Sequence, residues 1–256
     1  MRDLLRLYSI DSVHPNEQAI KDYVCQRLQD FDCFFEETEF GIVGNTAHYE
    51  DRDLNFLLSA HLDMVRTNGE PKHFYQDGSC IRGYLDDNTQ TSLGADDKNG
   101  IWLILKLAEM DLPFKFIMSV GEECGCVGIK QLKIPDADIC FVLDRRGYYE
   151  VLDSGAGTKY CSTLAQCLCN FWGKPWSTGT GSLSDTQIIS QKMESVNIST
   201  AYYNPHSATE FTNFTELDNL KEMLELAITN FKHYPTKPEV YNKRYDRGGW
   251  YGDRLL

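Results

Sequence analysis

Short apolar runs alternate with segments of helical periodicity along the chain. Four runs have the length and continuous apolar character of buried strands: LNFLLSA (54–60), FKFIMSV (114–120), DICFVL (138–143) and SVNIST (195–200). Apolar spacing predicts helices over 16–31, 100–110, 127–132, 159–172, 185–193 and 215–232. The polar stretch 66–94 predicts a hairpin around QDGS, and the Gly/Ser-rich stretch 174–185 predicts a loop. Alternating strands and helices predict an α/β fold with three α/β/α layers around a central mixed, mostly parallel sheet.

Length and charge narrow the class of protein. The 256 residues predict a single catalytic domain spanning 1–256, with an aromatic and basic tail over 235–256. The net charge of −13 argues against a nucleic-acid partner and suits a protein that attracts cations. No apolar run reaches the length of a membrane span, so we expect no membrane partner. The beginning MRDLLRLYSIDS lacks the apolar core of a signal peptide, so we expect a cytoplasmic protein with its nine cysteines reduced.

Potential metal ligands follow the predicted strands in a regular order. They are His61 in SAHLDMV, Asp96 in GADDKNG, Glu123 in GEECG, Asp144 in LDRRG and His206 in NPHSATE. In a parallel sheet, sites lie beyond the carboxyl ends of the strands, so we expect these side chains to meet at one edge. Imidazole and carboxylate ligands suit zinc, and also cobalt or manganese.

The ligand set favours two divalent ions that share one carboxylate. We expect one ion to take His61, Asp96 and Asp144, and the other to take Asp96, Glu123 and His206. Three carboxylates and a bridging hydroxide would balance the charge of two divalent cations, which allows partial burial.

Two more residues have predicted catalytic roles. Asp63 lies two residues after His61, so on an extended segment it could accept the second ring N–H of that histidine. Glu122 precedes a ligand and is itself free to act as general base on metal-bound water. Taken singly, HLD is typical of a satisfied core histidine and EE of a solvated surface. Their shared position after buried strands favours a site instead.

These motifs, with SIDSVHPNE near the start, resemble the co-catalytic dinuclear zinc exopeptidases, the group that holds peptidase T, carboxypeptidase G and the leucyl and deblocking aminopeptidases. The resemblance spans residues 9 to about 232. It implies the zinc-exopeptidase fold, the same five metal ligands with Asp96 bridging, Glu122 as base, and often a cis bond between Asp96 and Asp97. Many relatives carry a lid domain. The stretch between Asp144 and His206 is too short for one, so the chain resembles the lidless, single-domain form.

Three functions stay open from the sequence. The resemblance favours an aminopeptidase that hydrolyses a small peptide or aminoacyl amide through a dinuclear-metal-activated water. An amidohydrolase or carboxypeptidase acting on N-acyl amino acids would use the same metals, with Arg145, Arg146 or the tail arginines holding the substrate carboxylate. The third is a non-catalytic binding protein on the same fold. Homo-oligomers are compatible with each. Without a lid, substrate contacts would come from Tyr202, Tyr203, the GTGSLSD loop with Asp185, or the tail.

Overall fold

The central sheet contains nine strands in a computed structural model that describes residues 1–50 and 52–235. The strand order is β1-β2-β7-β3-β8-β12-β9-β10, and β11 pairs with β9. The bounds are β1 Phe34–Thr38, β2 Gly41–Asn45, β3 Phe56–His61, β7 Lys115–Ser119, β8 Ile139–Arg145, β9 Glu150–Gly155, β10 Thr158–Lys159, β11 Ser177–Gly181 and β12 Glu194–Ser199. The inner strands β7, β3, β8 and β12 run parallel to their neighbours in that group, and antiparallel strands flank them. The sheet is therefore mixed and mostly parallel at its centre, as predicted.

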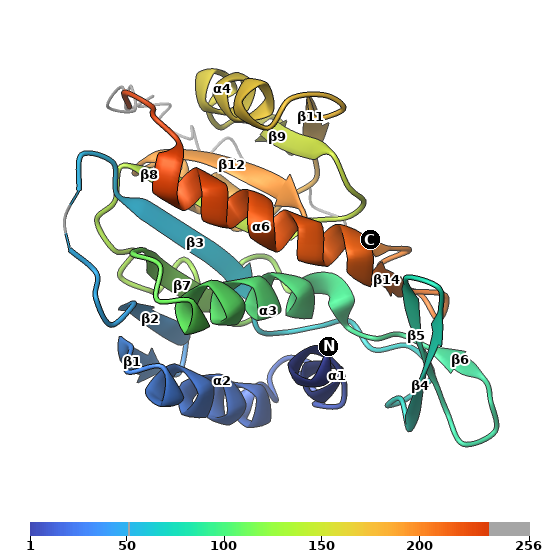
Figure 1. Ribbon diagram of the computed structural model, residues 1–256. Helices are drawn as coiled ribbons and strands as arrows, with labels where there is room; N and C mark the ends of the chain where they lie inside the picture. Colours follow the sequence, from blue (N-terminus) through green and yellow to red (C-terminus); the bar gives the residue numbers. More distant parts are fainter. Residues whose placement is uncertain (51, 236–256) are drawn as a thin grey trace, which may run out of the picture.

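Helices cover both faces of this sheet, unequally. The bounds are α1 Arg2–Tyr8, α2 Gln18–Asp30, α3 Ala95–Glu109, α4 Ser162–Trp172, α5 Thr186–Ile189 and α6 Phe214–Asn230. In Figure 1, α2, α3 and α6 lie across one face of the sheet. The larger apolar core lies between this face and the helices, where Leu58 of β3 and Phe141 of β8 contribute fully buried side chains. A smaller core on the other face includes Leu57, Ile129 and Ile189 of α5. The α/β prediction is confirmed, with one layer thinner than the other.

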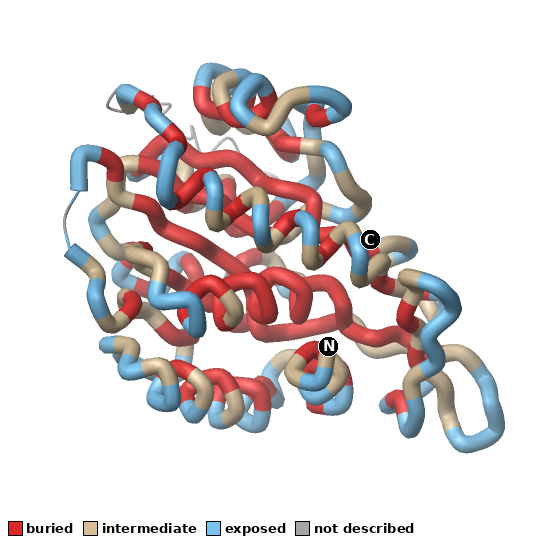
Figure 2. Tube along the Cα trace, viewed as in Figure 1, coloured by how far each residue is buried: buried red, intermediate tan, exposed pale blue. Residues whose placement is uncertain are grey.

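Burial explains why these helices form where they do. In α2 the buried residues Ile20, Val24 and Leu28 recur every four positions, so they share one face. Helix α3 is buried almost all round, as expected for a helix at the centre of a layer. Figure 2 shows the same distribution, with α3 and the central strands buried and the outer faces of the peripheral helices exposed.

A second, smaller sheet lies beyond the carboxyl ends of the inner strands. It has the order β13-β14-β5-β4, with β6 paired to β5. The bounds are β4 His73–Asp77, β5 Cys80–Tyr84, β6 Gln90–Thr91, β13 Tyr202–Tyr203 and β14 Phe211–Asn213. The β4–β5 hairpin turns at Gly78 and Ser79, which confirms the hairpin predicted around QDGS. In Figure 1 this hairpin projects from the side of the molecule that also holds the start of α3.

Several predicted elements were wrong in kind or extent. Residues 127–132 form turns, because Val127 and Gly128 donate back to the chain at Gly121 and Val120 and close a compact loop. The 174–185 stretch contains strand β11, whose ladder with β9 stabilises an extended path that its glycines alone would not predict. The helix predicted from 159 begins at Ser162, since Thr158–Lys159 pairs with β9, and the helix predicted to reach Met193 ends at Ile189.

Several elements had no prediction at all, namely α1, the β1–β2 hairpin, β9, β13 and β14. Asn213 caps α6 by accepting a hydrogen bond from the Glu216 amide, so this helix starts one residue before the predicted range. No helix in residues 1–50 or 52–235 is long and apolar enough to cross a membrane. A single domain over 1–256 stays a prediction, and the tail from residue 236 onward lies outside the described residues.

Candidate metal centre

The parallel inner strands bring the predicted ligands to one edge of the sheet. His61 is the last residue of β3, and Asp144 is the next-to-last residue of β8. Glu123 follows the end of β7. Asp96 belongs to the first turn of α3, and His206 lies in the connection between β13 and β14. All five predicted ligands therefore come together, although they span most of the described chain.

Asp96 lies between two histidines and faces each with a different oxygen. Its Oδ1 is 3.2 Å from His61 Nε2, and its Oδ2 is 3.3 Å from His206 Nε2. His206 Nε2 also lies 2.6 Å from Glu123 Oε1, and His61 Nε2 lies 3.6 Å from Asp144 Oδ1. The side chains thus form two groups that share one carboxylate, an arrangement that could hold two neighbouring cations.

The potential ligand atoms of the two groups are close enough to hold an ion each. Those of Asp96, Glu123 and His206 lie within 4.8 Å of one another. On the other side, His61 meets the same limit with Asp97 and Asp144, where the sequence predicted Asp96, and also with Glu122 and Glu123. Asp97 already accepts hydrogen bonds from the backbone amides of His61 at 3.2 Å and Gly100 at 3.1 Å. The Asp97 carboxylate is therefore occupied by backbone hydrogen bonds that hold the chain around the centre, and Asp96 is the more available metal ligand.

Asp63 contacts the neighbouring glutamate segment more closely than the histidine ring. Its Oδ1 accepts the Glu122 amide at 2.9 Å, and its Oδ2 accepts the Glu123 amide at 3.0 Å. The Nδ1 atom of His61 lies 3.1 Å from the Asp63 carbonyl oxygen and 3.4 Å from Oδ1. The carboxylate therefore fixes the backbone that carries Glu122 and Glu123, and the carbonyl is the nearer acceptor for the ring.

Glu210 is a supporting residue that the sequence analysis missed. It is 1% exposed and accepts the Gly94 amide at 2.7 Å and the Asp96 amide at 3.2 Å. These bonds hold the turn that presents Asp96 to both histidines. Glu210 ends the NPHSATE motif, four residues after His206, and that position was the one sign in the sequence of a role at the site. The sequence pattern did not indicate that Glu210 would contact the GADDKNG turn. The Asp96–Asp97 peptide bond is cis, as the resemblance implies.

Buried charge shifts the titration of the site strongly. Burial, with the nearby charge of Asp144, raises the pKa of Glu122 to about 10, and burial raises the pKa of Asp144 to about 7. Burial also opposes ionisation of Asp96, but hydrogen bonds from His206 and His61 outweigh it and hold the pKa of Asp96 below its usual value. Hydrogen bonds to Asp96 and Glu123 raise the pKa of His206 to about 10. Four carboxyl groups lie close together with only two histidines beside them. Divalent cations fit such a donor set, because the positive charge of the cations would compensate the excess negative charge of the carboxylates.

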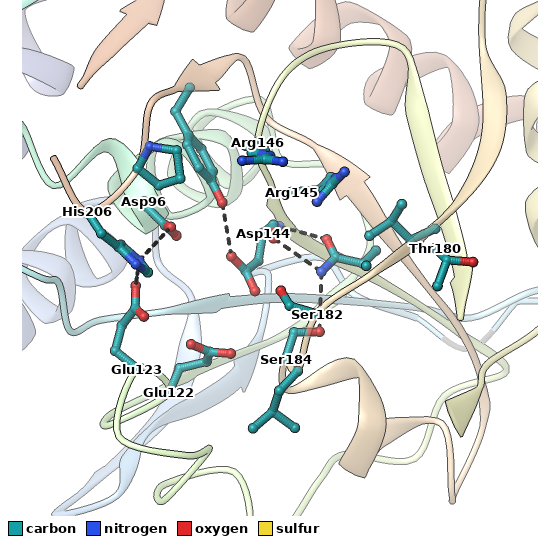
Figure 3. A pocket seen from close by; sticks show the side chains of 16 residues that line it. Asp96, Glu122, Glu123, Asp144, Arg145, Arg146, Thr180, Ser182, Ser184 and His206 are labelled. Atoms are coloured by element: carbon teal, nitrogen blue, oxygen red, sulfur yellow. Dashed lines mark hydrogen bonds and ion pairs between the residues drawn. The ribbon is translucent and has the colours of Figure 1, made fainter. Parts of the chain in front are cut away.

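A pocket of about 490 Å³ opens over this centre. Figure 3 shows Glu122, Glu123, Asp96, Asp144 and His206 on its wall. His61 and Asp63 lie behind that wall, 2% and 1% exposed. The volume is within the range of about 300–1,000 Å³ that is usual for small-molecule sites.

The fold is shared with solved structures of peptidases. The aminopeptidase PepT from Bacillus cereus matches at a TM-score of 0.74 and 17% identity, over 89% of this chain and 96% of that one. A tripeptidase from Staphylococcus aureus matches at 0.75 and 17%, over the same shares. An aminopeptidase from the archaeon Desulfurococcus kamchatkensis matches at 0.68 and 14%, over 93% of this chain and 95% of that one. At these identities the likeness shows the fold. No family model and no curated protein sequence matches the chain.

The expected substrate-contacting residues divide into two groups. Tyr202 lines the pocket, with its hydroxyl 3.5 Å from Asp144 Oδ1, and residues 180–184 of the GTGSLSD loop line it as well. Tyr203 instead donates to Glu216, and Asp185 is 2% exposed and accepts the Ser119 hydroxyl beneath the pocket. Asp185 also makes no side-chain cap to α5. Asp185 thus contacts other buried residues of the fold and does not line the pocket.

Proposed function

We propose that the protein is a metal-dependent exopeptidase that removes the amino-terminal residue of short peptides. The observation that carries this proposal is Asp96, whose two oxygens face His61 and His206 separately. A shared carboxylate between two histidine–carboxylate groups suits a dinuclear site, which hydrolytic enzymes use to activate water. The peptidases with the same fold support the choice of a peptide bond as the target.

Each residue then has a defined task. His61, Asp96 and Asp144 would hold one divalent ion, and Asp96, Glu123 and His206 the other. When bound, the ions lower the pKa of water and polarise a carbonyl group. Zinc fits these ligands, as do cobalt and manganese.

Glu122 is the proposed general base. Its backbone is held by Asp63, its carboxyl group faces the pocket, and it is not needed as a ligand. Burial raises the pKa of this carboxyl group, and bound cations would oppose that shift and leave it ionised, which is the form that accepts a proton. It would take a proton from the attacking water and pass it to the leaving amine. Asp63 would keep Glu122 and Glu123 in register with the ligands.

The second candidate is an amidohydrolase or carboxypeptidase on N-acyl amino acids. The presence of Arg145 and Arg146 on the pocket wall favours it, because such substrates carry a carboxylate. A paired assay separates the two functions. Short peptides with a free amino terminus and with an acetylated one are offered in added zinc or cobalt, and the released products are identified.

Release of the amino-terminal residue from the free-amine peptide alone supports the aminopeptidase. Cleavage of the acetylated peptide moves the protein to the second candidate. No cleavage of either form, with two metal ions bound, refutes both and favours a binding protein.

A further inference from the structure

A further group of potential metal ligands adjoins the metal centre through Glu122. It consists of Glu122, Cys126 and Asp185, whose potential ligand atoms lie within 4.8 Å of one another. Cys126 is 1% exposed and Asp185 2%, whereas Glu122 also lines the pocket. Of the comparable groups in residues 1–50 and 52–235, only this one contains a cysteine. Its donor set is therefore softer than that of the catalytic centre.

Asp185 brings an incompletely paired carboxylate to this group. Its Oδ2 accepts the Ser119 hydroxyl. Its Oδ1 has no hydrogen bond of normal geometry within residues 1–50 and 52–235, and the polar group beside the carboxylate is the Cys126 thiol, a weak donor. Burial raises the pKa of Asp185 to about 6. A buried oxygen of this kind costs free energy until a donor or a cation satisfies it.

The backbone holds the three side chains in place. The Cys126 amide donates to the Glu122 carbonyl at 2.8 Å, which closes a turn and brings Sγ to 3.8 Å from Glu122 Oε1. Asp63 holds the Glu122 amide at 2.9 Å. The Asp185 carbonyl accepts the Ile189 amide at 3.1 Å, at the start of α5. The three donors are therefore positioned before any ligand arrives, which favours binding.

We propose that Glu122, Cys126 and Asp185 bind a third divalent cation of soft character, zinc or cadmium, and that this ion inhibits the enzyme. Thiolate sulfur and carboxylate oxygen are both ligands of such cations. Burial and the charges of Asp185 and Glu122 raise the pKa of Cys126, so the thiol keeps its proton until the cation binds and then releases it to solvent. The cation would compensate most of the three negative charges that result.

Inhibition follows from the position of Glu122. Its carboxyl group faces the pocket, so the ion can reach the group through the pocket. A carboxylate that ligates the third ion is no longer available to accept a proton from the attacking water. This effect on activity rests on the proposed function, but binding of the ion does not. The catalytic centre has more ligands and should fill first, so inhibition should begin above the metal concentration that activates.

The test titrates cadmium chloride into the full chain loaded with two zinc ions. Cadmium–thiolate bonds absorb in the ultraviolet, and the catalytic centre has no cysteine among its predicted ligands, so the absorption reports the third ion. We expect one cadmium ion beside two zinc ions per chain by metal analysis. The absorption should rise over the same cadmium range in which peptide hydrolysis is lost.

Two variants and a control locate the ion. Cys126→Ser should abolish the absorption and weaken the third ion at least about 100-fold, since loss of a residue that only supports a ligand already costs about 10–100-fold. The matched control is Cys124→Ser, which removes an exposed thiol of the same loop outside the group and should keep the native titration. Asp185→Asn keeps an oxygen for the Ser119 hydroxyl and should weaken the third ion while both zinc ions stay bound. It decides the matter if Cys126→Ser does not fold.

The outcomes separate the site from its effect. No thiolate absorption in the native chain, or a native titration in Cys126→Ser or Asp185→Asn, overturns the third site. Full hydrolysis with the third ion bound overturns the inhibition and leaves the site. If the zinc-loaded chain hydrolyses no peptide, the proposed function fails, and the absorption titration still decides whether the third ion binds.

Discussion

Replacing Asp63 with Asn would test how the catalytic segment is held in place. The Asp63 side chain is fully buried, and its two oxygens each accept one backbone amide, from Glu122 and Glu123. An asparagine has a single oxygen, so one amide N–H would face the new NH2 group, donor against donor. The substitution keeps the size of the side chain, and the loss is therefore one charge-assisted hydrogen bond and one newly unsatisfied buried donor.

The expected loss is about 2–4 kcal/mol of unfolding free energy, from the range for hydrogen bonds to charged groups and for unsatisfied buried donors. For a chain of this size, this corresponds to a fall of about 5–15 °C in melting temperature. The turnover number should also fall by about 100-fold, because small displacements of Glu122 and Glu123 disturb alignment with the reacting atoms. Urea unfolding of chelator-treated protein measures the first effect, and peptide hydrolysis with added zinc measures the second.

Asp86→Asn is the matched control, since Asp86 is exposed on the loop after β5. It should change the unfolding free energy by less than about 0.5 kcal/mol. An equally small change in Asp63→Asn would refute the backbone role. Loss of activity with native stability would instead indicate that Asp63 acts through the ring of His61.

Other variants test the remaining parts of the site. Glu122→Gln should lower kcat at least about 100-fold while two metal ions per chain remain bound, because the base is lost and the ligands are kept; metal analysis beside the assay checks both. Metal affinity should rise with pH up to about 10, since His206 must release the proton that Asp96 and Glu123 stabilise before it can ligate. Calorimetric titration with zinc at several pH values checks this, and an affinity that stays constant above about pH 7, where Asp144 has lost its proton, would contradict it. Burial raises the pKa of Glu210 from 4.5 to about 7, so the folded chain binds this proton more tightly than the unfolded chain. Stability should therefore decline as pH rises from about 4.5 to about 7, and Glu210→Gln should remove that part of the decline in urea midpoints of the chelator-treated protein.

The sequence by itself determined the inner sheet and the edge at which the predicted ligands meet. Runs such as FKFIMSV are continuous apolar segments because both faces of a central parallel strand are buried. Polar residues that directly follow such strands must lie at the same edge, so His61, Glu123 and Asp144 were predictable neighbours. The hairpin at QDGS was also predictable, because a two-residue turn depends on local residues.

Peripheral elements depended on neighbours that local patterns do not describe. Strand β11 is formed of Ser, Thr and Gly, and its extended shape comes from pairing with β9. The hairpin β1–β2 lies at the edge of the sheet, where half-exposed strands lose the continuous apolar signal. Residues 127–132 have helical apolar spacing, yet contacts with the Gly121 region close them into turns.

Which polar residues contact one another within the site was decided by tertiary structure alone. Sequence spacing suggested that Asp63 would contact His61, and its Oδ1 does lie 3.4 Å from the ring Nδ1. The spacing did not indicate that the Glu122 and Glu123 amides, 59 and 60 residues away, would donate to the same carboxylate. Glu210 reaches the Asp96 turn across 114 residues, and no local pattern carries that information. Hydrophobic periodicity reports which face of an element is buried. It does not report which polar groups meet there, because that depends on how separate elements pack together.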